Sequence, residues 1–346
     1  MSVANGTVAY GLKQRPAAGI AGKHVPFASV PVIDLAPLRR PNGPSGDDPA
    51  GKRQVARAIG RACEEVGFLY VANHGIPPAL IDGAFAEAKR FFTLPLDQKL
   101  KLDIKDSANY RGYFPIKREK TDVTAEGDLK EGFDLMRELG PDDPDVRAGK
   151  PLHGPNRWPD DLPGFRDAIL AYYAAMEDLA RLLLRGMALS LDLDEHWFAD
   201  KTVKPIGYLR LLHYPPQPGP IDERAIGCGA HSDYGCLTIL AQDQVGGLQL
   251  RNSAGEWIEA PPIPGTFVIN LGDQMARWTN ERFQATPHRV INRSGRERYS
   301  IPFFFDPDYD AVVECLPTCQ GPDNPPKHAP ITGGEHLLSM LNATFK

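Results

Sequence analysis

The feature that most constrains the fold is a change of hydrophobic period near Pro205. Beyond it, short apolar segments are bounded by Gly, Pro, Asn or Asp, as in β-strands joined by turns. The segments are GYLRLLHY, IGCGAHSD, CLTILAQ, GGLQLRN, GTFVINLG, QATPHRVIN and RYSIPFFFD. Regularly spaced short strands of this kind predict a sandwich or jelly roll.

The part of the chain before Pro205 has mainly helical spacing. Apolar residues recur there at intervals of three or four, which predicts amphipathic helices near residues 55–66, 80–92 and 165–191. Short strands are predicted at residues 30–35 and in FLYVANHG, and residues 1–30 are expected to be irregular. A short helix is predicted at residues 334–341.

Residues 103–163 are polar, rich in Gly and Pro, and poorly periodic. So long a weakly structured stretch is usually a functional lid or an insertion. Its charged residues suit either a polar small molecule or a solvated loop: Arg118, Glu119, Lys120, Asp128, Lys130 and Glu131. We therefore predict one domain over residues 1–346. It comprises a helix-rich part (1–204) with an active-site insertion (103–163), a metal-binding jelly-roll core (205–310) and a C-terminal extension (311–346).

Composition narrows the class of protein. With 42% apolar and 24% charged residues, the chain is not expected to be disordered. The net charge of -5 provides no general attraction to nucleic acid or anionic lipid, so neither is an expected partner. Five scattered cysteines and a start without an apolar signal segment favour a cytoplasmic location. The oligomeric state stays open.

His231-Ser232-Asp233 is the one His-x-Asp of the chain, and His288 follows in a later strand-like segment. A histidine and a carboxylate two apart on a strand point to one face and can chelate one ion. Two imidazoles and a carboxylate form the facial triad that holds Fe(II), although they also suit zinc. The ordinary alternatives are a solvated turn for AHSDYG and a hydrogen-bonded sheet histidine for His288.

Arg298 and Ser300 lie ten and twelve residues beyond His288 and share one strand face. A guanidinium fork and a hydroxyl on one face can bind a carboxylate, whereas an exposed arginine at a strand end is the ordinary alternative. What is uncommon is the order His-x-Asp, His, Arg-x-Ser within one strand-rich half. That order indicates a metal site beside an anion site.

These motifs resemble the Fe(II)- and 2-oxoglutarate-dependent dioxygenases with the isopenicillin N synthase-like fold. VPVIDLAPL and GFLYVANHGIP resemble the family's opening elements, and the segments from RLLHYPPQP to RYSIPFFFDP resemble its core in the same order. The resemblance implies a mixed α and β fold with a mainly β core, a double-stranded β-helix (jelly roll) flanked by helices. It also implies iron ligation by His231, Asp233 and His288. Arg298 and Ser300 would bind the distal carboxylate of 2-oxoglutarate.

Residues near the expected co-substrate show one departure from the family. Plant hydroxylases often have Asn two residues before the Tyr of the Tyr-Pro-Pro segment, and here Leu212 precedes Tyr214. The Tyr214 hydroxyl remains available to the co-substrate. Arg210 shares the strand parity of both residues, and it either assists an anionic ligand or covers the outer face of the sheet. Four aromatic residues are candidates for pocket walls or for simple core: Tyr234, Trp278, Phe303 and Phe305.

The implied reaction uses Fe(II), 2-oxoglutarate and O2, with ascorbate as a stimulant. It oxidises a small-molecule substrate, usually by hydroxylation, and releases succinate and CO2. The alternatives are a same-fold Fe(II) oxidase without 2-oxoglutarate, a zinc or manganese cupin-like hydrolase or isomerase, and a binding module without catalysis. HGPNRWP and GEH also resemble the microbial ethylene-forming enzyme, whose C-terminal helix carries an arginine where this chain has Ala343. That difference favours the succinate-forming reaction.

Overall fold

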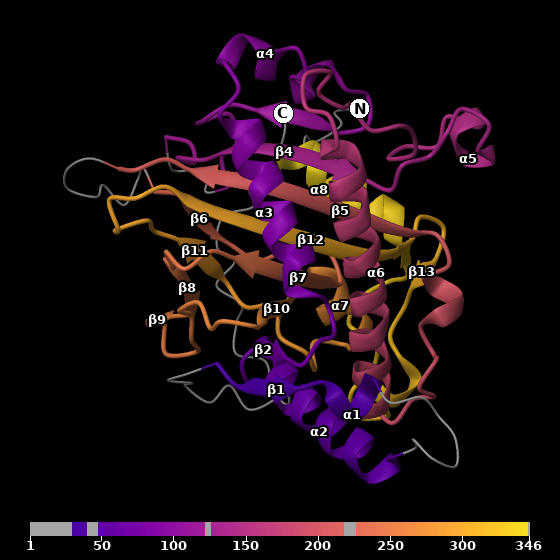
Figure 1. The fold of residues 1–346 in the computed structure, drawn as a ribbon. Helices are drawn as coiled ribbons and strands as arrows, with labels where there is room; N and C mark the ends of the chain where they lie inside the picture. The colour runs from indigo at the N-terminus through magenta and orange to yellow at the C-terminus, as the bar shows by residue number, and fades with distance from the viewer. Residues whose placement is uncertain (1–29, 40–47, 122–125, 218–225, 345–346) are drawn as a thin grey trace, which may run out of the picture.

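The computed structural model describes residues 30–39, 48–121, 126–217 and 226–344. The irregular arm predicted for residues 1–30 therefore lies almost wholly outside the described residues. The large sheet has the order β1-β2-β10-β7-β12-β5-β4-β3, and the second sheet has the order β6-β11-β8-β9 (Figure 1). All pairs are antiparallel except β1 with β2.

The strands of the large sheet are β1 (Val32–Asp34), β2 (Phe68–Ala72), β3 (Gly112–Phe114), β4 (Glu131–Met136), β5 (Pro205–Tyr214), β7 (Leu237–Gln242), β10 (Phe267–Leu271) and β12 (Arg298–Asp308). The second sheet contains β6 (Cys228–His231), β8 (Leu248–Arg251), β9 (Trp257–Glu259) and β11 (His288–Val290). A small pair is formed by β13 (Val312–Val313) and β14 (Ile331–Thr332). Each of the strand segments predicted after residue 205 contains a strand, and β9 was not predicted.

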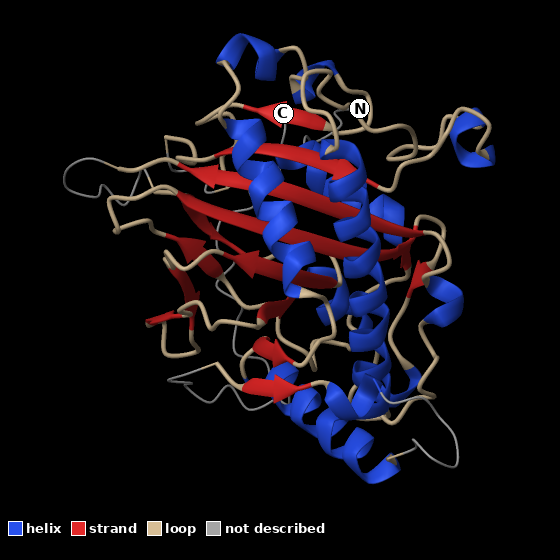
Figure 2. Cartoon of the chain, viewed as in Figure 1, coloured by secondary structure: helices blue, strands red, loops and turns tan. Residues whose placement is uncertain are grey.

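The α-helices are α1 (Ala36–Arg39), α2 (Pro49–Glu65), α3 (Pro78–Phe92), α4 (Leu96–Leu100), α5 (Pro144–Arg147), α6 (Phe165–Ser190), α7 (Asp273–Trp278) and α8 (Gly333–Thr344). The predicted helices correspond to α2, α3, α6 and α8. Figure 2 shows α3 and α6 lying across one face of the large sheet. Among the described residues, no helix combines the length and the apolar character needed to cross a membrane.

Strand parity in β12 divides the sheet into two environments. Ile301, Phe303 and Phe305 belong to the main apolar core, which the helices cover. The alternate residues from Arg298 to Asp306 line a cavity on the opposite face. Because successive side chains of a strand point to opposite faces, one strand both anchors the core and builds the site.

β4 corrects the expectation for residues 103–163. Glu131–Met136 is a fully buried strand, paired with β5 from Glu131 opposite His213 to Met136 opposite Tyr208. The prediction of a weakly structured insertion was therefore wrong for these residues. Glu131 and Asp134 make this segment polar in the sequence, which is why no strand was predicted here. Both carboxylates are neutralised, because Lys99 Nζ lies 2.7 Å from Glu131 Oε2 and Arg210 pairs with Asp134.

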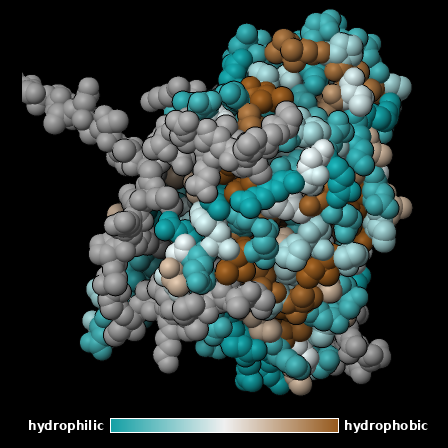
Figure 3. Space-filling model, turned by 90° about the vertical axis from the view of Figure 1, so that its left-hand side faces the viewer, coloured by the Kyte–Doolittle hydropathy of each residue, from teal (hydrophilic) through white to brown (hydrophobic). Residues whose placement is uncertain are grey.

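The exposed surface has a mixed character. Six large apolar side chains remain exposed among the described residues, and they are dispersed apart from Leu96 and Leu100, which share α4: Val32, Leu96, Leu100, Ile116, Val203 and Val312. On the face in Figure 3, small apolar groups alternate with polar side chains. This pattern is ordinary for a folded domain, since single exposed apolar residues are common.

Candidate active site

A group of two imidazoles and one carboxylate lies where the second sheet faces the cavity. His231 ends β6 and His288 begins β11, and the two residues are direct partners across these strands. Asp233 follows β6, and its Oδ1 lies 3.6 Å from the Nε2 atom of each imidazole. One ligand atom of each residue lies within 4.8 Å of the other two. Elsewhere in the described part of the chain, no three His, Cys, Asp or Glu side chains are arranged in this way.

Backbone carbonyls orient both imidazoles. His231 Nδ1 donates to the carbonyl oxygen of Gly229 at 2.9 Å, and His288 Nδ1 donates to that of Thr286 at 3.2 Å. With the proton held at Nδ1, each Nε2 keeps its lone pair on the side of Asp233, where a metal ion would be bound. Metal-binding histidines commonly have this support for the second ring nitrogen.

The two carboxylate oxygens of Asp233 have different surroundings. Its Oδ2 accepts hydrogen bonds from Thr238 Oγ1 at 2.5 Å and Asn270 Nδ2 at 2.6 Å. Oδ1 is left facing the imidazoles. Burial alone would raise the pKa of Asp233, but the imidazoles of His288 and His231 have a larger effect in the opposite direction. The pKa of this carboxyl therefore lies well below its usual range. The donor set thus fits a divalent metal ion, which binds deprotonated ligands.

Asn270→Ala is expected to weaken Fe(II) binding about tenfold, because loss of a partner that orients a metal ligand typically lowers affinity by about 10- to 100-fold. The measurement is the Fe(II) dissociation constant under nitrogen. Asn292→Ala is the matched control, since both asparagines are 2% exposed and Asn292 does not line the cavity. Equal Fe(II) affinities in the two variants would contradict a supporting role for Asn270.

Arg298 and Ser300 occupy another part of the same cavity. Arg298 is fully buried; its Nε donates to the carbonyl oxygen of Gly246 at 2.6 Å, and its Nη1 donates to Ser300 Oγ at 3.3 Å. Tyr214 is its partner on β5, and the guanidinium carbon lies 4.6 Å from the centre of that ring. Within the described residues, no carboxylate forms an ion pair with Arg298. A buried cation without a counter-ion is unfavourable, so this arrangement favours an anionic ligand.

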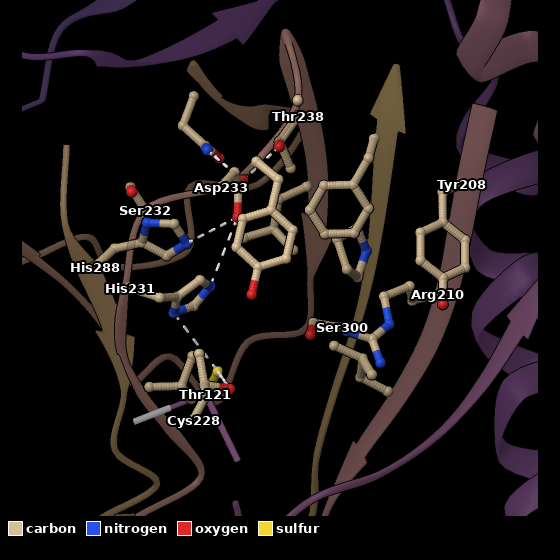
Figure 4. A pocket seen from close by; sticks show the side chains of 18 of the residues that line it. Thr121, Tyr208, Arg210, Cys228, His231, Ser232, Asp233, Thr238, His288 and Ser300 are labelled. Atoms are coloured by element: carbon tan, nitrogen blue, oxygen red, sulfur yellow. Dashed lines mark hydrogen bonds and ion pairs between the residues drawn. The ribbon is translucent and has the colours of Figure 1, made fainter. Parts of the chain in front are cut away.

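The cavity brings these groups together. It has a volume of about 130 Å³ and is lined from both sheets and from α8. Figure 4 shows the triad on one side of the cavity and Arg210 with Tyr208 on the other. The structure therefore places His231, Asp233, His288, Tyr214, Arg298, Ser300 and Arg210 around one space.

Arg210 faces the cavity, so the alternative that it covers the outer face of the sheet was wrong. It lies on β5 four residues before Tyr214, and both residues line the cavity. Its Nε lies 2.9 Å from Asp134 Oδ1, and its Nη1 lies 3.0 Å from Glu119 Oε1. Two acidic residues therefore neutralise Arg210, whereas Arg298 has no such partner in the described part of the chain.

The four aromatic candidates divide between the two roles that the sequence left open, cavity wall and core. Tyr234 lines the cavity, but Phe303 and Phe305 face the helix-covered core because of their strand parity. Trp278 packs in the same core, with its ring centre 5.1 Å from that of Phe198. The sequence analysis missed further lining residues, among them Tyr208, Phe304, Asp306, Leu337 and Leu341. Strand alternation from Ser300 would have found Phe304 and Asp306, whereas no sequence signal brings α8 to the cavity.

Comparisons with known proteins agree with this geometry. Residues 30–161 match the model of the non-haem dioxygenase in morphine synthesis N-terminal family, and residues 205–307 match the 2OG-Fe(II) oxygenase superfamily. The 2-oxoglutarate-Fe(II) type oxidoreductase hxnY of Emericella nidulans is 40% identical over 91% of this chain and 89% of its own length. Homoarginine-6-hydroxylase 2-ODD-C23 of Glycine max is 36% identical over 92% of this chain and 98% of its own length.

Solved structures show the same relation. Neurospora crassa T7H in complex with alpha-KG and thymine has a TM-score of 0.79 and 30% identity, covering 91% of this chain and 96% of that one. A 2OG-Fe(II) oxygenase family protein from Caulobacter crescentus has a TM-score of 0.79 and 31% sequence identity. That match covers 91% of this chain and 99% of the other. The cofactors of the reaction are therefore Fe(II), 2-oxoglutarate and O2. The chain belongs to the 2-oxoglutarate- and Fe(II)-dependent oxygenases of the isopenicillin N synthase-like type.

Proposed function

We propose that this dioxygenase holds Fe(II) through His231, Asp233 and His288 and the distal carboxylate of 2-oxoglutarate through Arg298 and Ser300. The reaction is hydroxylation of a small molecule, with release of succinate and CO2. One observation carries the proposal. Three side chains that could hold a metal ion line the same cavity as a buried arginine that has no carboxylate partner among the described residues.

Some of these side chains would hold the metal and the co-substrate, and others would exclude water. When bound, iron supplies the O2 chemistry that decarboxylates 2-oxoglutarate and oxidises the substrate. The triad would hold the metal ion, and the Arg298 fork with the Ser300 hydroxyl would fix the far end of the co-substrate. The Tyr214 ring packs beside Arg298, and its hydroxyl is proposed as a further co-substrate contact. Leu337 and Leu341 of α8 line the cavity, and their apolar side chains are proposed to exclude water from it.

Three further features are proposed from sequence rather than from this site. These are stimulation by ascorbate, a cytoplasmic location, and function without nucleic-acid or membrane partners. The alternative of a zinc or manganese hydrolase gives Arg298 no role, because such chemistry needs the triad alone. Metal analysis after anaerobic purification separates that alternative from an iron enzyme.

The protein is expected to convert 2-oxoglutarate to succinate and to release no appreciable ethylene when arginine is present. The physical reason is that position 343 on α8 is alanine, which cannot supply the cation of the ethylene-forming enzyme. The test measures succinate and headspace ethylene over protein, Fe(II), ascorbate, 2-oxoglutarate and arginine. Ethylene as a major product would overturn the proposed reaction, and substrate oxidation without succinate would favour the oxidase without 2-oxoglutarate.

A further inference from the structure

Residues 232–236 connect β6 to β7 and include Asp233, the proposed carboxylate ligand of iron. We call these residues the metal loop. They belong to neither sheet, so the ladder hydrogen bonds of the strands do not fix their position. Because a metal ligand is oriented by the groups that hold it, the partners of this loop bear on how Asp233 is presented.

The start of α7 holds the middle of the metal loop through backbone groups. Asp273 N donates to the carbonyl oxygen of Asp233 at 2.8 Å, and Gln274 N donates to those of Tyr234 at 3.2 Å and Gly235 at 3.1 Å. Backbone amides make these bonds, so this part of the support does not depend on a particular side chain.

A buried carboxylate on β12 holds the far end of the metal loop. Asp306 Oδ1 accepts a hydrogen bond from Cys236 N at 2.6 Å. A Cβ at Gly235 would lie 2.0 Å from the same oxygen, so this close approach requires glycine. The metal loop is therefore held between β12 and α7.

The C-terminal helix supplies a third support, and this one comes from a side chain. His336 lies in the first turn of α8, and its Nε2 donates to the carbonyl oxygen of Tyr234 at 2.9 Å. That oxygen also accepts the longer bond from Gln274 N, as its two lone pairs allow. His336 therefore holds the peptide group between Tyr234 and Gly235, one residue beyond Asp233.

The helix α8 also forms part of the cavity wall. Leu337 follows His336 directly and lines the cavity together with the Tyr234 side chain. At the other end of α8, Asn342 Oδ1 accepts a hydrogen bond from the Tyr110 hydroxyl at 2.8 Å. The helix is thus joined to the metal loop at its start and to the segment before β3 at its end.

We propose that His336 is a positioning residue of the iron site. Its hydrogen bond to the Tyr234 carbonyl fixes the metal loop and thereby the presentation of Asp233. This inference rests on the proposed function, because it takes Asp233 as a ligand of iron. By thermodynamic linkage, a bond that favours Fe(II) binding is itself favoured by Fe(II) to the same degree. Bound Fe(II) therefore also holds α8 against the cavity.

The test is the Fe(II) dissociation constant of the full chain, titrated under nitrogen. His336→Phe keeps a ring but removes the donor, and it should weaken Fe(II) binding about three- to tenfold, the loss expected for one neutral hydrogen bond. His336→Gln retains an N–H donor at a reach similar to that of Nε2. It should stay within about twofold of the wild-type constant.

Two controls separate this bond from a general change in the protein. Asn342→Ala removes the contact of α8 with Tyr110 but leaves His336 in place, and it should change the Fe(II) constant less than about twofold. His196→Phe makes the same substitution at an exposed histidine outside the cavity lining, and it should bind Fe(II) as the wild type does.

A second measurement uses the wild-type protein, so it applies even where His336→Phe does not fold. Amide hydrogen exchange of residues 333–342 is followed under nitrogen with and without Fe(II). Linkage predicts that Fe(II) slows this exchange about three- to tenfold, the same factor as for the Fe(II) constant. In a folded His336→Phe variant, Fe(II) should slow it less.

The outcomes separate this inference from the proposed function. Wild-type protein that does not bind Fe(II) overturns the proposed function. If the wild type binds Fe(II) and His336→Phe binds it equally well, the role of His336 is overturned. The same holds if folded His336→Gln binds as weakly as His336→Phe, if Asn342→Ala weakens binding as much, or if Fe(II) does not slow exchange in wild-type α8.

Discussion

Asp233→Ala, His231→Ala and His288→Ala are each expected to lower succinate formation more than about 100-fold. Three side chains supply all the protein ligands of an Fe(II) site of this kind, so each substitution removes one ligand of the three. The expected effect exceeds that of losing a supporting partner, which costs about 10- to 100-fold. The measurements are succinate released per minute and Fe(II) bound per chain.

Folding must be separated from metal loss in these variants. Asp233 and both histidines line a cavity, so their truncation leaves the helix-covered core intact, and near-normal circular dichroism is expected. Asp310→Ala and His328→Ala are control substitutions of the same residue types outside the cavity lining. Near-full activity of Asp233→Ala without an added anion would refute the assignment of the metal site.

Local periodicity explains why much of the fold could be predicted. β12 alternates core residues such as Phe303 with cavity residues such as Ser300, and the alternation is legible in RYSIPFFFD. The short spacing of His231 and Asp233 brought them together in the prediction, although Asp233 lies just beyond the end of β6. The pairing of His288 with His231 required more, since it depends on how separate strands are ordered in the second sheet. The resemblance to a known family supplied that long-range information.

Long-range neutralisation explains what could not be predicted. Glu131 and Asp134 make β4 look like a polar loop, yet both are buried because Lys99 and Arg210 reach them from other elements. Likewise, Arg210 could not be assigned from strand parity alone, since Glu119 belongs to a distant part of the chain. The contact of α8 with the cavity has the same origin, because hydrophobic spacing predicts a helix but not the surface against which it packs.

Arg298→Leu is expected to raise the 2-oxoglutarate concentration needed for half-maximal turnover about 30-fold or more. Removing one partner of a buried charge pair costs about 2 to 5 kcal/mol, since the other charge is left unpaired. Ser300→Ala should raise that concentration only about three- to tenfold, because one neutral hydrogen bond contributes about 0.5 to 1.5 kcal/mol. The measurement is succinate formation as a function of 2-oxoglutarate concentration in both variants.

The contrast with another arginine makes this prediction specific. Arg289 lies on β11, where its Nε donates to Gln249 at 2.8 Å and its guanidinium covers the Trp257 ring at 4.0 Å, outside the cavity lining. Arg289→Leu loses a comparable charge and should keep the wild-type dependence on 2-oxoglutarate. If Arg298→Leu and Ser300→Ala also keep it, Arg298 serves only its contacts with Gly246 and Ser300. 2-Oxoglutarate would then be bound by other residues of the cavity.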